Sequence, residues 1–172
     1  MALFPPLDMN PEDVRAALAP LRNDFSVAVY TAENAFAVGA IIRVAHSFLA
    51  REIILIGSSP HYEKASMGME KYETITRVQD DDAFLQHVAG RPVWALEKDR
   101  ARASLYGITA FPKNVVLLFG SERFGIPAPM LERADEVLGI PIYGVNHSLP
   151  LAVASGIVMS EWARRHYVDK TF

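Results

Sequence analysis

Residues 114–127 read NVVLLFGSERFGIP, an uninterrupted apolar run followed at once by a loop that contains two glycines. The run at 114–119 has the length and composition of a buried strand, and the loop leads into a helical pattern at 128–134. Similar apolar runs occur at 25–30, 52–56, 92–96 and 136–140, and further helical patterns at 38–49, 81–88 and 151–167. Because near-continuous apolar strands separated by helices form parallel sheets covered on both faces, the sequence predicts an α/β fold.

The composition is that of one ordinary globular domain. The chain has 172 residues, of which 51% are hydrophobic and 22% charged, and it contains no cysteine. The lack of cysteine excludes disulfides, cysteine-ligated metals and cysteine nucleophiles, and is typical of proteins from a reducing compartment. The longest nearly uncharged stretch, 148–160, is shorter than the ~20 residues of a membrane helix, and no basic segment precedes the first apolar residues. We therefore expect a single cytoplasmic domain over 1–172.

The net charge of −3 provides no general attraction for nucleic acid, so any contact with RNA has to be local. Two basic clusters could provide such a contact or could simply be solvated surface. They are Lys98, Arg100 and Arg102, and near the C-terminus Arg164, Arg165, His166 and Lys170. The histidines at 46, 61, 87, 147 and 166 show no metal-ligand spacing, so we expect no metal site.

The loop after 114–119 is the first candidate for ligand binding, because ligands of parallel α/β sheets bind at the carboxyl ends of the strands. Gly120 and Gly125 permit positive φ angles and close approach of a ligand to the main chain, although a plain turn has the same composition. The loop is neither a Walker loop, a GxSxG elbow nor a GxGxxG fingerprint. His147 and Ser148 are adjacent, but neighbours in sequence rarely face each other as a catalytic triad requires.

Arg43 is the second candidate. In the helical pattern around it, an apolar stripe faces one way, while Gly39, Arg43, His46 and Ser47 share the opposite face. Such an arginine is either solvated, or it offers its fixed fork of donors to a phosphate.

Three segments of the chain resemble the signature motifs of SpoU-type (TrmH-like) methyltransferases of the SPOUT superfamily. The first is ENAFAVGAIIR at 33–43, and the second is LFGSE at 118–122. The third combines Ile140-Pro141 with Ser148-Leu149 and the small-residue helix that follows. The three occur in the order and with the separations typical of the family, and together they span most of the chain from Glu33 to about Trp162.

The resemblance implies a parallel sheet flanked by helices with a C-terminal trefoil knot, and a pocket for S-adenosylmethionine inside that knot. It also implies methylation of a ribose 2′-hydroxyl in tRNA or rRNA by a homodimer whose active site lies near the subunit boundary, with no DNA or membrane partner. Backbone contacts to the cofactor are implied at Leu96, Gly120, Ile140, Ser148 and Leu149. Catalytic positions are implied at Arg43, Asn34 and Glu122, with Arg43 holding a phosphate and stabilising the developing alkoxide.

The chain departs from the family pattern at two positions. Family members commonly have asparagine where this chain has Ala37 and Pro150, and neither residue offers the hydrogen bonds of an asparagine side chain. One alternative is therefore a knotted dimer that binds S-adenosylmethionine or RNA but transfers methyl weakly or not at all. A nucleotide-using α/β transferase of unrelated chemistry is another.

The last helical pattern bears on the oligomeric state. Leu151, Ala154, Val158 and Trp162 form one apolar stripe along it. This stripe either covers the protomer's own sheet or presents more apolar surface than a terminal helix needs. We take the second reading, and expect the stripe to form the interface of a homodimer.

Overall fold

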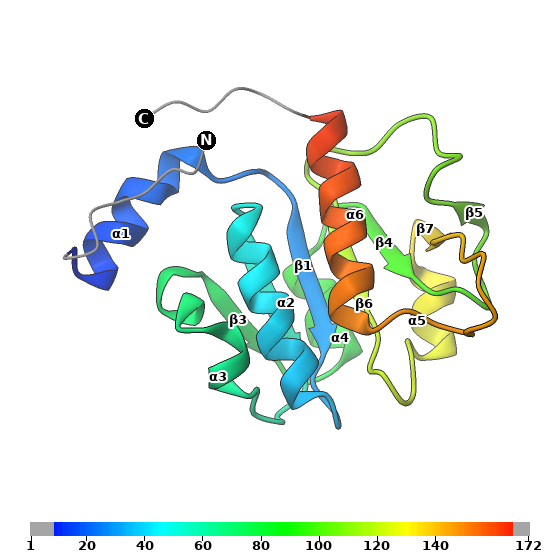
Figure 1. Ribbon diagram of the computed structural model, residues 1–172, viewed down its shortest axis with the longest axis horizontal. Helices are drawn as coiled ribbons and strands as arrows, with labels where there is room; N and C mark the ends of the chain where they lie inside the picture. The colour runs from blue at the N-terminus through cyan, green and yellow to red at the C-terminus, as the bar shows by residue number, and fades with distance from the viewer. Residues whose placement is uncertain (1–8, 167–172) are drawn as a thin grey trace.

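The computed structural model describes residues 9–166, which form a seven-stranded, wholly parallel sheet with helices on both faces (Figure 1). The strands lie in the order β3-β2-β1-β6-β4-β7-β5. They are β1 (Ser26–Tyr30), β2 (Glu52–Ile56), β3 (Ile75–Val78), β4 (Val93–Leu96), β5 (Ala103–Ser104), β6 (Val116–Phe119) and β7 (Glu136–Gly139). The helices are α1 (Pro11–Leu18), α2 (Ala35–Ser47), α3 (Glu63–Ser66), α4 (Asp81–His87), α5 (Ala128–Arg133) and α6 (Leu151–Arg165), with short 3₁₀ turns η1 (Ala19–Leu21) and η2 (Met69–Tyr72).

The sheet has two hydrophobic clusters, one on each face. Helices α2 and α6 lie side by side over one face, while α4 and α5 cover the other (Figure 1). Successive strand residues alternate between the clusters, so Val27 and Val29 of β1 join the first and Ala28 joins the second. This double burial is the reason that the five inner strands are apolar at most positions, and the parallel α/β prediction is confirmed. Within residues 9–166, no helix has the length and apolarity needed to cross a membrane.

The apolar stripe of α6 covers the protein's own sheet. Val158 and Trp162 are buried in the cluster beneath α6, and the Trp162 ring lies 4.5 Å, between centroids, from the ring of Phe25. The Trp162 indole also donates a hydrogen bond of 3.0 Å to the carbonyl of Pro112. Leu151 and Ala154 are half-buried. The part of the prediction that placed Val158 and Trp162 in a dimer interface is therefore wrong, because both side chains are buried within the protomer.

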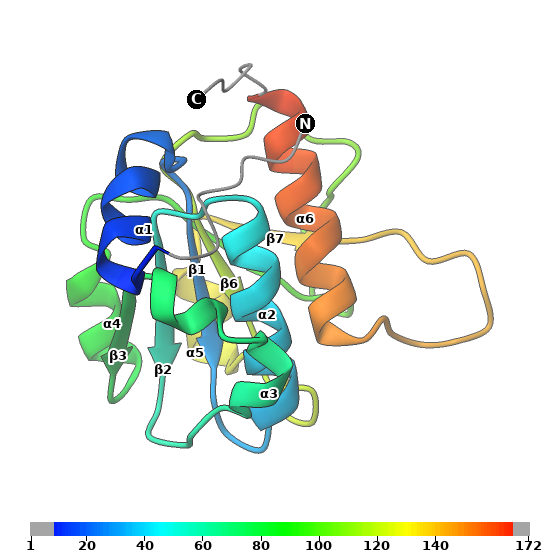
Figure 2. The ribbon, with the colours of Figure 1, turned by 60° about the vertical axis from the view of Figure 1, so that its left-hand side comes forward.

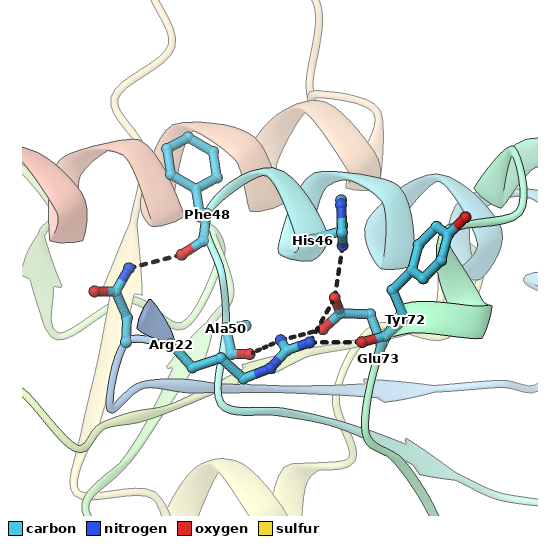
Figure 3. Close-up of polar contacts among 7 residues, drawn as sticks. Arg22, His46, Phe48, Ala50, Tyr72 and Glu73 are labelled. Carbon is cyan, nitrogen blue, oxygen red and sulfur yellow. Dashed lines mark hydrogen bonds and ion pairs between the residues drawn. The ribbon is translucent and has the colours of Figure 1, made fainter. Parts of the chain in front are cut away.

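A buried ion cluster ties α2 to the segments before β1 and β3 (Figure 3). The side chain of Glu73 is fully buried and accepts hydrogen bonds from both terminal nitrogens of Arg22, at 2.7 and 3.1 Å. Its Oε1 also lies 2.7 Å from Nδ1 of His46 on α2. Arg22 donates further bonds to the carbonyls of Ala50 and Tyr72, at 2.7 and 2.6 Å. Three separate chain segments thus share one carboxylate.

Candidate functional site

A cavity of about 640 Å³ lies at the carboxyl ends of β4, β6 and β7. The strand order brings these three ends together, because β6 neighbours β4 and β4 neighbours β7. The residues for which backbone contacts to a cofactor were expected all line this cavity: Leu96, Gly120, Ile140, Ser148 and Leu149. They come from three loops far apart in the sequence, and the fold gathers them around one space.

The glycine loop after β6 closes on itself. Ser121 and Gly125 exchange backbone hydrogen bonds of 3.1 and 3.0 Å, and Gly125 has a φ of +64°. A Cβ on Gly120 would lie 2.3 Å from the carbonyl carbon of Gly125, which no side chain could tolerate. Gly125 thus adopts the positive φ expected for this loop, whereas Gly120 does not and is required for the loop to close.

The segment from β7 to α6 forms the outer wall of the cavity and extends away from the body of the protein (Figure 2). Two contacts hold it in place. The Lys98 ammonium donates to the carbonyl of His147, and the Glu122 carboxylate accepts a weak bond of 3.5 Å from the backbone N–H of Leu151. In the sequence, Lys98 was noted only as part of a basic cluster. The residues around Lys98 in the sequence do not indicate that it bonds to the carbonyl of His147.

The expected catalytic residues do not all meet in one protomer. Glu122 lines the cavity, whereas Arg43 lies on the exposed side of α2 and lines a different hollow. Asn34 is only 3% exposed, and its Nδ2 donates to the carbonyl of Tyr30 at 3.3 Å. Its Oδ1 has no hydrogen-bond partner among the described residues. An ion pair of 3.0 Å between Glu33 and Arg123 links the segment before α2 to the glycine loop.

The two departures from the family pattern have different structural settings. Ala37 is 4% exposed on the inner side of α2, so an asparagine there would have to bury its amide. Pro150 is the N-cap of α6, and its carbonyl accepts bonds from Val153 and Ala154, at 2.9 and 3.0 Å. Because the N-cap position needs no backbone donor, proline fits the local structure of α6.

The basic clusters are largely occupied by contacts within the protein. Arg102 donates to the carbonyls of Leu131 and Ala134. At the end of α6, Arg164 and Arg165 both bond Glu161, and together these bonds lower the pKa of the Glu161 carboxyl to about 2. His166 contacts the carbonyl of Phe111 at 2.7 Å, while Lys170 lies outside the described residues. Most of these basic side chains therefore have partners within the protein.

Comparisons with known proteins identify the family of this chain. The family model described as "SpoU rRNA Methylase family" matches residues 24–160. The structure resembles that of an AdoMet-bound rRNA methyltransferase from Sinorhizobium meliloti, with 32% sequence identity, a TM-score of 0.75 and coverage of 91% of this chain and 61% of that chain. It also resembles a structure described by "2-OH methylation of C/U34 on tRNA", with 28% identity, a TM-score of 0.76 and coverage of 84% and 97%.

Among curated proteins, the 23S rRNA (guanosine-2′-O-)-methyltransferase RlmB of Ralstonia nicotianae is 28% identical over 137 residues. These residues are 76% of this chain and 55% of that relative, so the chain spans about half the length of this relative. The match of the family model includes the glycine loop, the segment between β7 and α6, and helix α2 with Arg43. The chain therefore belongs to the SpoU rRNA methylase family.

Proposed function

We propose that this protein transfers a methyl group from S-adenosylmethionine to a ribose 2′-hydroxyl in tRNA or rRNA. The observation that carries the proposal is the cavity at the ends of β4, β6 and β7, which is lined by every residue for which a cofactor contact was expected. One related structure is described as an AdoMet-bound rRNA methyltransferase, and another concerns 2-OH methylation of C/U34 on tRNA. These descriptions support both the cofactor and the substrate class.

The lining of the cavity suits this cofactor. A volume of about 640 Å³ lies within the range of small-molecule sites, which is ~300–1,000 Å³. The carboxyl-bearing residues Glu97, Asp99 and Glu122 outnumber the cations Lys98 and Arg123 in the wall, and this excess of negative charge favours a cationic sulfonium. The apolar side chains of Leu138 and Ile140 also line the cavity, and they could contact the adenine ring of the cofactor. When bound, the cofactor would supply an electrophilic methyl group.

The residues of the protein would position the ribose and stabilise the negative charge that develops on its 2′-oxygen during transfer. Arginine stays protonated at all physiological pH values, so Arg43 would hold a phosphate and stabilise negative charge that develops on the reacting oxygen. Glu122 would act near the substrate at the rim of the cavity. Holding the hydroxyl in line with the methyl group accelerates transfer by proximity.

We also propose that two copies of the chain form the active unit. Arg43 does not line the cavity of its own protomer, so a homodimer in which Arg43 of one protomer lies near the cavity of the other would complete the site. The exposed face of α6, with Val153 48% exposed and Ile157 beside it in a shallow hollow, is the surface that we assign to this contact.

Three further features belong to the proposal. The first is a C-terminal trefoil knot, supported by the insertion of β7 between the earlier strands β4 and β5 and by the return of α6 to α2. The second is that 1–172 acts as a single methyltransferase domain, supported by the one sheet that all described strands share. The third is a cytoplasmic place of action, supported by the tRNA and rRNA substrates named for the relatives.

Calorimetry is expected to show one S-adenosylmethionine bound per protomer, and Ala154→Phe is expected to abolish most of this binding. Ala154 lines the cavity from α6, so a phenyl ring at that position would fill space that the cofactor needs. Ala154→Ser is the matched control, because it adds only one oxygen, and it should bind nearly as the wild type does. Absence of binding to the wild type at millimolar cofactor would contradict the proposed function.

Light scattering is expected to give twice the 19.0 kDa mass of the chain. Val153→Glu should shift the protein toward the monomer, because it places a charge in the exposed apolar face of α6. Circular dichroism would check that the helix content is retained. A mass of 19.0 kDa for the wild type over a broad concentration range would rule out the homodimer.

A further inference from the structure

The hollow that contains Arg43 is separate from the cofactor cavity. It has a volume of about 470 Å³ and lies between α2 and the segment that contains α3. Phe36 and Arg43 line it from α2, and Tyr62, Lys64 and Met67 line it from the facing segment. Strand pairing does not bring α2 and the α3 segment together. The hollow therefore depends on direct packing between these two segments.

Gly39 is the residue that allows the two walls to meet. A Cβ on Gly39 would lie 2.4 Å from the carbonyl oxygen of Tyr62 and 2.9 Å from Cβ of Ala65, so any other residue would push α3 away from α2. The facing segment is itself fixed by a hydrogen bond of 2.5 Å from Ser66 to Glu70. Burial raises the pKa of the Glu70 carboxyl, but the bond from Ser66, a backbone hydrogen bond and the nearby His61 and Lys71 together hold this pKa below its ordinary value. The walls are therefore held in place.

The hollow exposes large apolar side chains in one place. Phe36 is 68% exposed, Tyr62 46% and Met67 63%, although residues of this kind are usually covered. The rings of Phe36 and Tyr62 are stacked, with 6.2 Å between centroids and 27° between planes. The backbone of Tyr62 is fixed by a 2.8 Å hydrogen bond to the carbonyl of Ala35, at the start of α2. Two aromatic faces are thus presented to solvent on a rigid support.

The charges around these rings are positive. Arg43 and Lys64 line the hollow, and the described residues that line it include no acid. Exposed rings beside cations are the combination that binds single-stranded RNA, since bases stack on the rings while phosphates meet the cations. Interface cores of proteins share the aromatic residues, methionine and arginine of this hollow but are depleted of lysine, so Lys64 is the residue that distinguishes the two kinds of partner. The composition of the hollow therefore favours RNA over a second protein surface.

We propose that Phe36 and Tyr62 form a platform on which an unpaired RNA base stacks while Arg43 and Lys64 hold the neighbouring phosphates. A base between the two rings would need about 7 Å, twice the ~3.4 Å rise of stacked bases, so the base continues the stack on an outer ring face. Arg43 lies two helical turns from Phe36, which is about 10 Å along α2, so a strand with a base stacked at Phe36 can extend its backbone toward Arg43. This platform rests on the proposed function and adds a preference for unpaired RNA beside the target.

The test measures binding of a fluorescein-labelled oligouridylate, free or paired with oligoadenylate, by fluorescence anisotropy. The wild type is expected to prefer the free strand. Phe36→Ala and Tyr62→Ala should each weaken binding of the free strand on the order of 10-fold to 100-fold, as expected for loss of a stacking contact. The matched variants Phe36→Tyr and Tyr62→Phe keep the rings and should bind within about twofold of the wild type. Lys64→Ala should make the salt dependence of binding shallower.

Several results would overturn the platform. One is oligouridylate binding by Phe36→Ala and Tyr62→Ala that equals binding by the wild type. Another is a change from dimer to monomer in light scattering of these variants, which would assign the hollow to a second copy of the chain. Failure of the proposed function can be distinguished from failure of the platform. If the wild type transfers no methyl group but binds RNA in a way that depends on the two rings, the proposed activity is wrong and the platform is supported.

Discussion

Replacing Arg43 by alanine is expected to lower methyl transfer by about 100-fold or more, while the affinity for S-adenosylmethionine stays nearly unchanged. The fold-change is the scale for losing one group that stabilises charge in the transition state. Cofactor binding should be spared because Arg43 does not line the cavity in its own protomer. The measurement is incorporation of tritiated methyl into unmodified total RNA, with periodate sensitivity of the digested nucleosides reporting whether the 2′-oxygen was labelled.

Two variants make this result specific. Arg43→Lys should restore little activity, since a point charge cannot reproduce the planar fork of the guanidinium. Arg133→Ala is the matched control, because Arg133 is also an exposed helical arginine but lies on α5, across the sheet, where it pairs with Asp82. Equal transfer by Arg43→Ala and the wild type would remove the catalytic role of Arg43. If neither transfers methyl while both bind the cofactor, the chain is a binding protein that has lost catalysis.

Replacing Glu73 by alanine is expected to lower the free energy of unfolding by ~3–5 kcal/mol, the usual effect of removing one partner from a buried ion pair. The carboxylate is fully buried, and its loss would leave Arg22, with a side chain only 12% exposed, without its counter-charge. His46 would lose the same partner, so α2 would be held less firmly. Urea unfolding followed by circular dichroism measures the change.

The exposed pair of Arg133 and Asp82 provides the comparison. Asp82→Ala removes a contact of 2.9 Å between side chains that are both at least half exposed, and such pairs contribute less than about 1 kcal/mol. Glu73→Gln keeps the shape but removes the charge, and should fall between the two. If Glu73→Ala and Asp82→Ala destabilise the protein equally, the buried cluster does not support α2 in the way that Figure 3 indicates.

Much of the fold could be predicted from the sequence because five strands are buried on both faces and carry a strong apolar signal. Two edge strands were missed for the opposite reason. Strand β3 contains Thr76 and Arg77, and β5 consists of Ala103 and Ser104 alone, so neither has an apolar run. The stripe on α6 was recognised, but periodicity shows only that a helix has an apolar face. It does not show whether that face meets the protein's own sheet or another copy.

The candidate site was predictable to a similar extent. Family resemblance selected residues that the fold gathers around one cavity, because they follow strands that end at the same edge. The separation of Arg43 from that cavity was not predictable, since it depends on how α2 packs across the sheet. The stacked pair of Phe36 and Tyr62 was missed as well, because Tyr62 reaches Phe36 only through the close approach at Gly39, which pairs segments more than 20 residues apart.

The placement of α6 has a consequence for synthesis on the ribosome. The first half of the chain can form β1, β2 and α2, but Phe25, which directly precedes β1, lacks its aromatic partner until Trp162 has been translated and has left the exit tunnel. Synthesis at ~5–20 residues per second leaves the part of the apolar sheet face that α6 will cover open for several seconds or longer. During that time the nascent chain offers a binding site for holdase chaperones, and a stop codon before α6 would leave the same surface permanently exposed to aggregation.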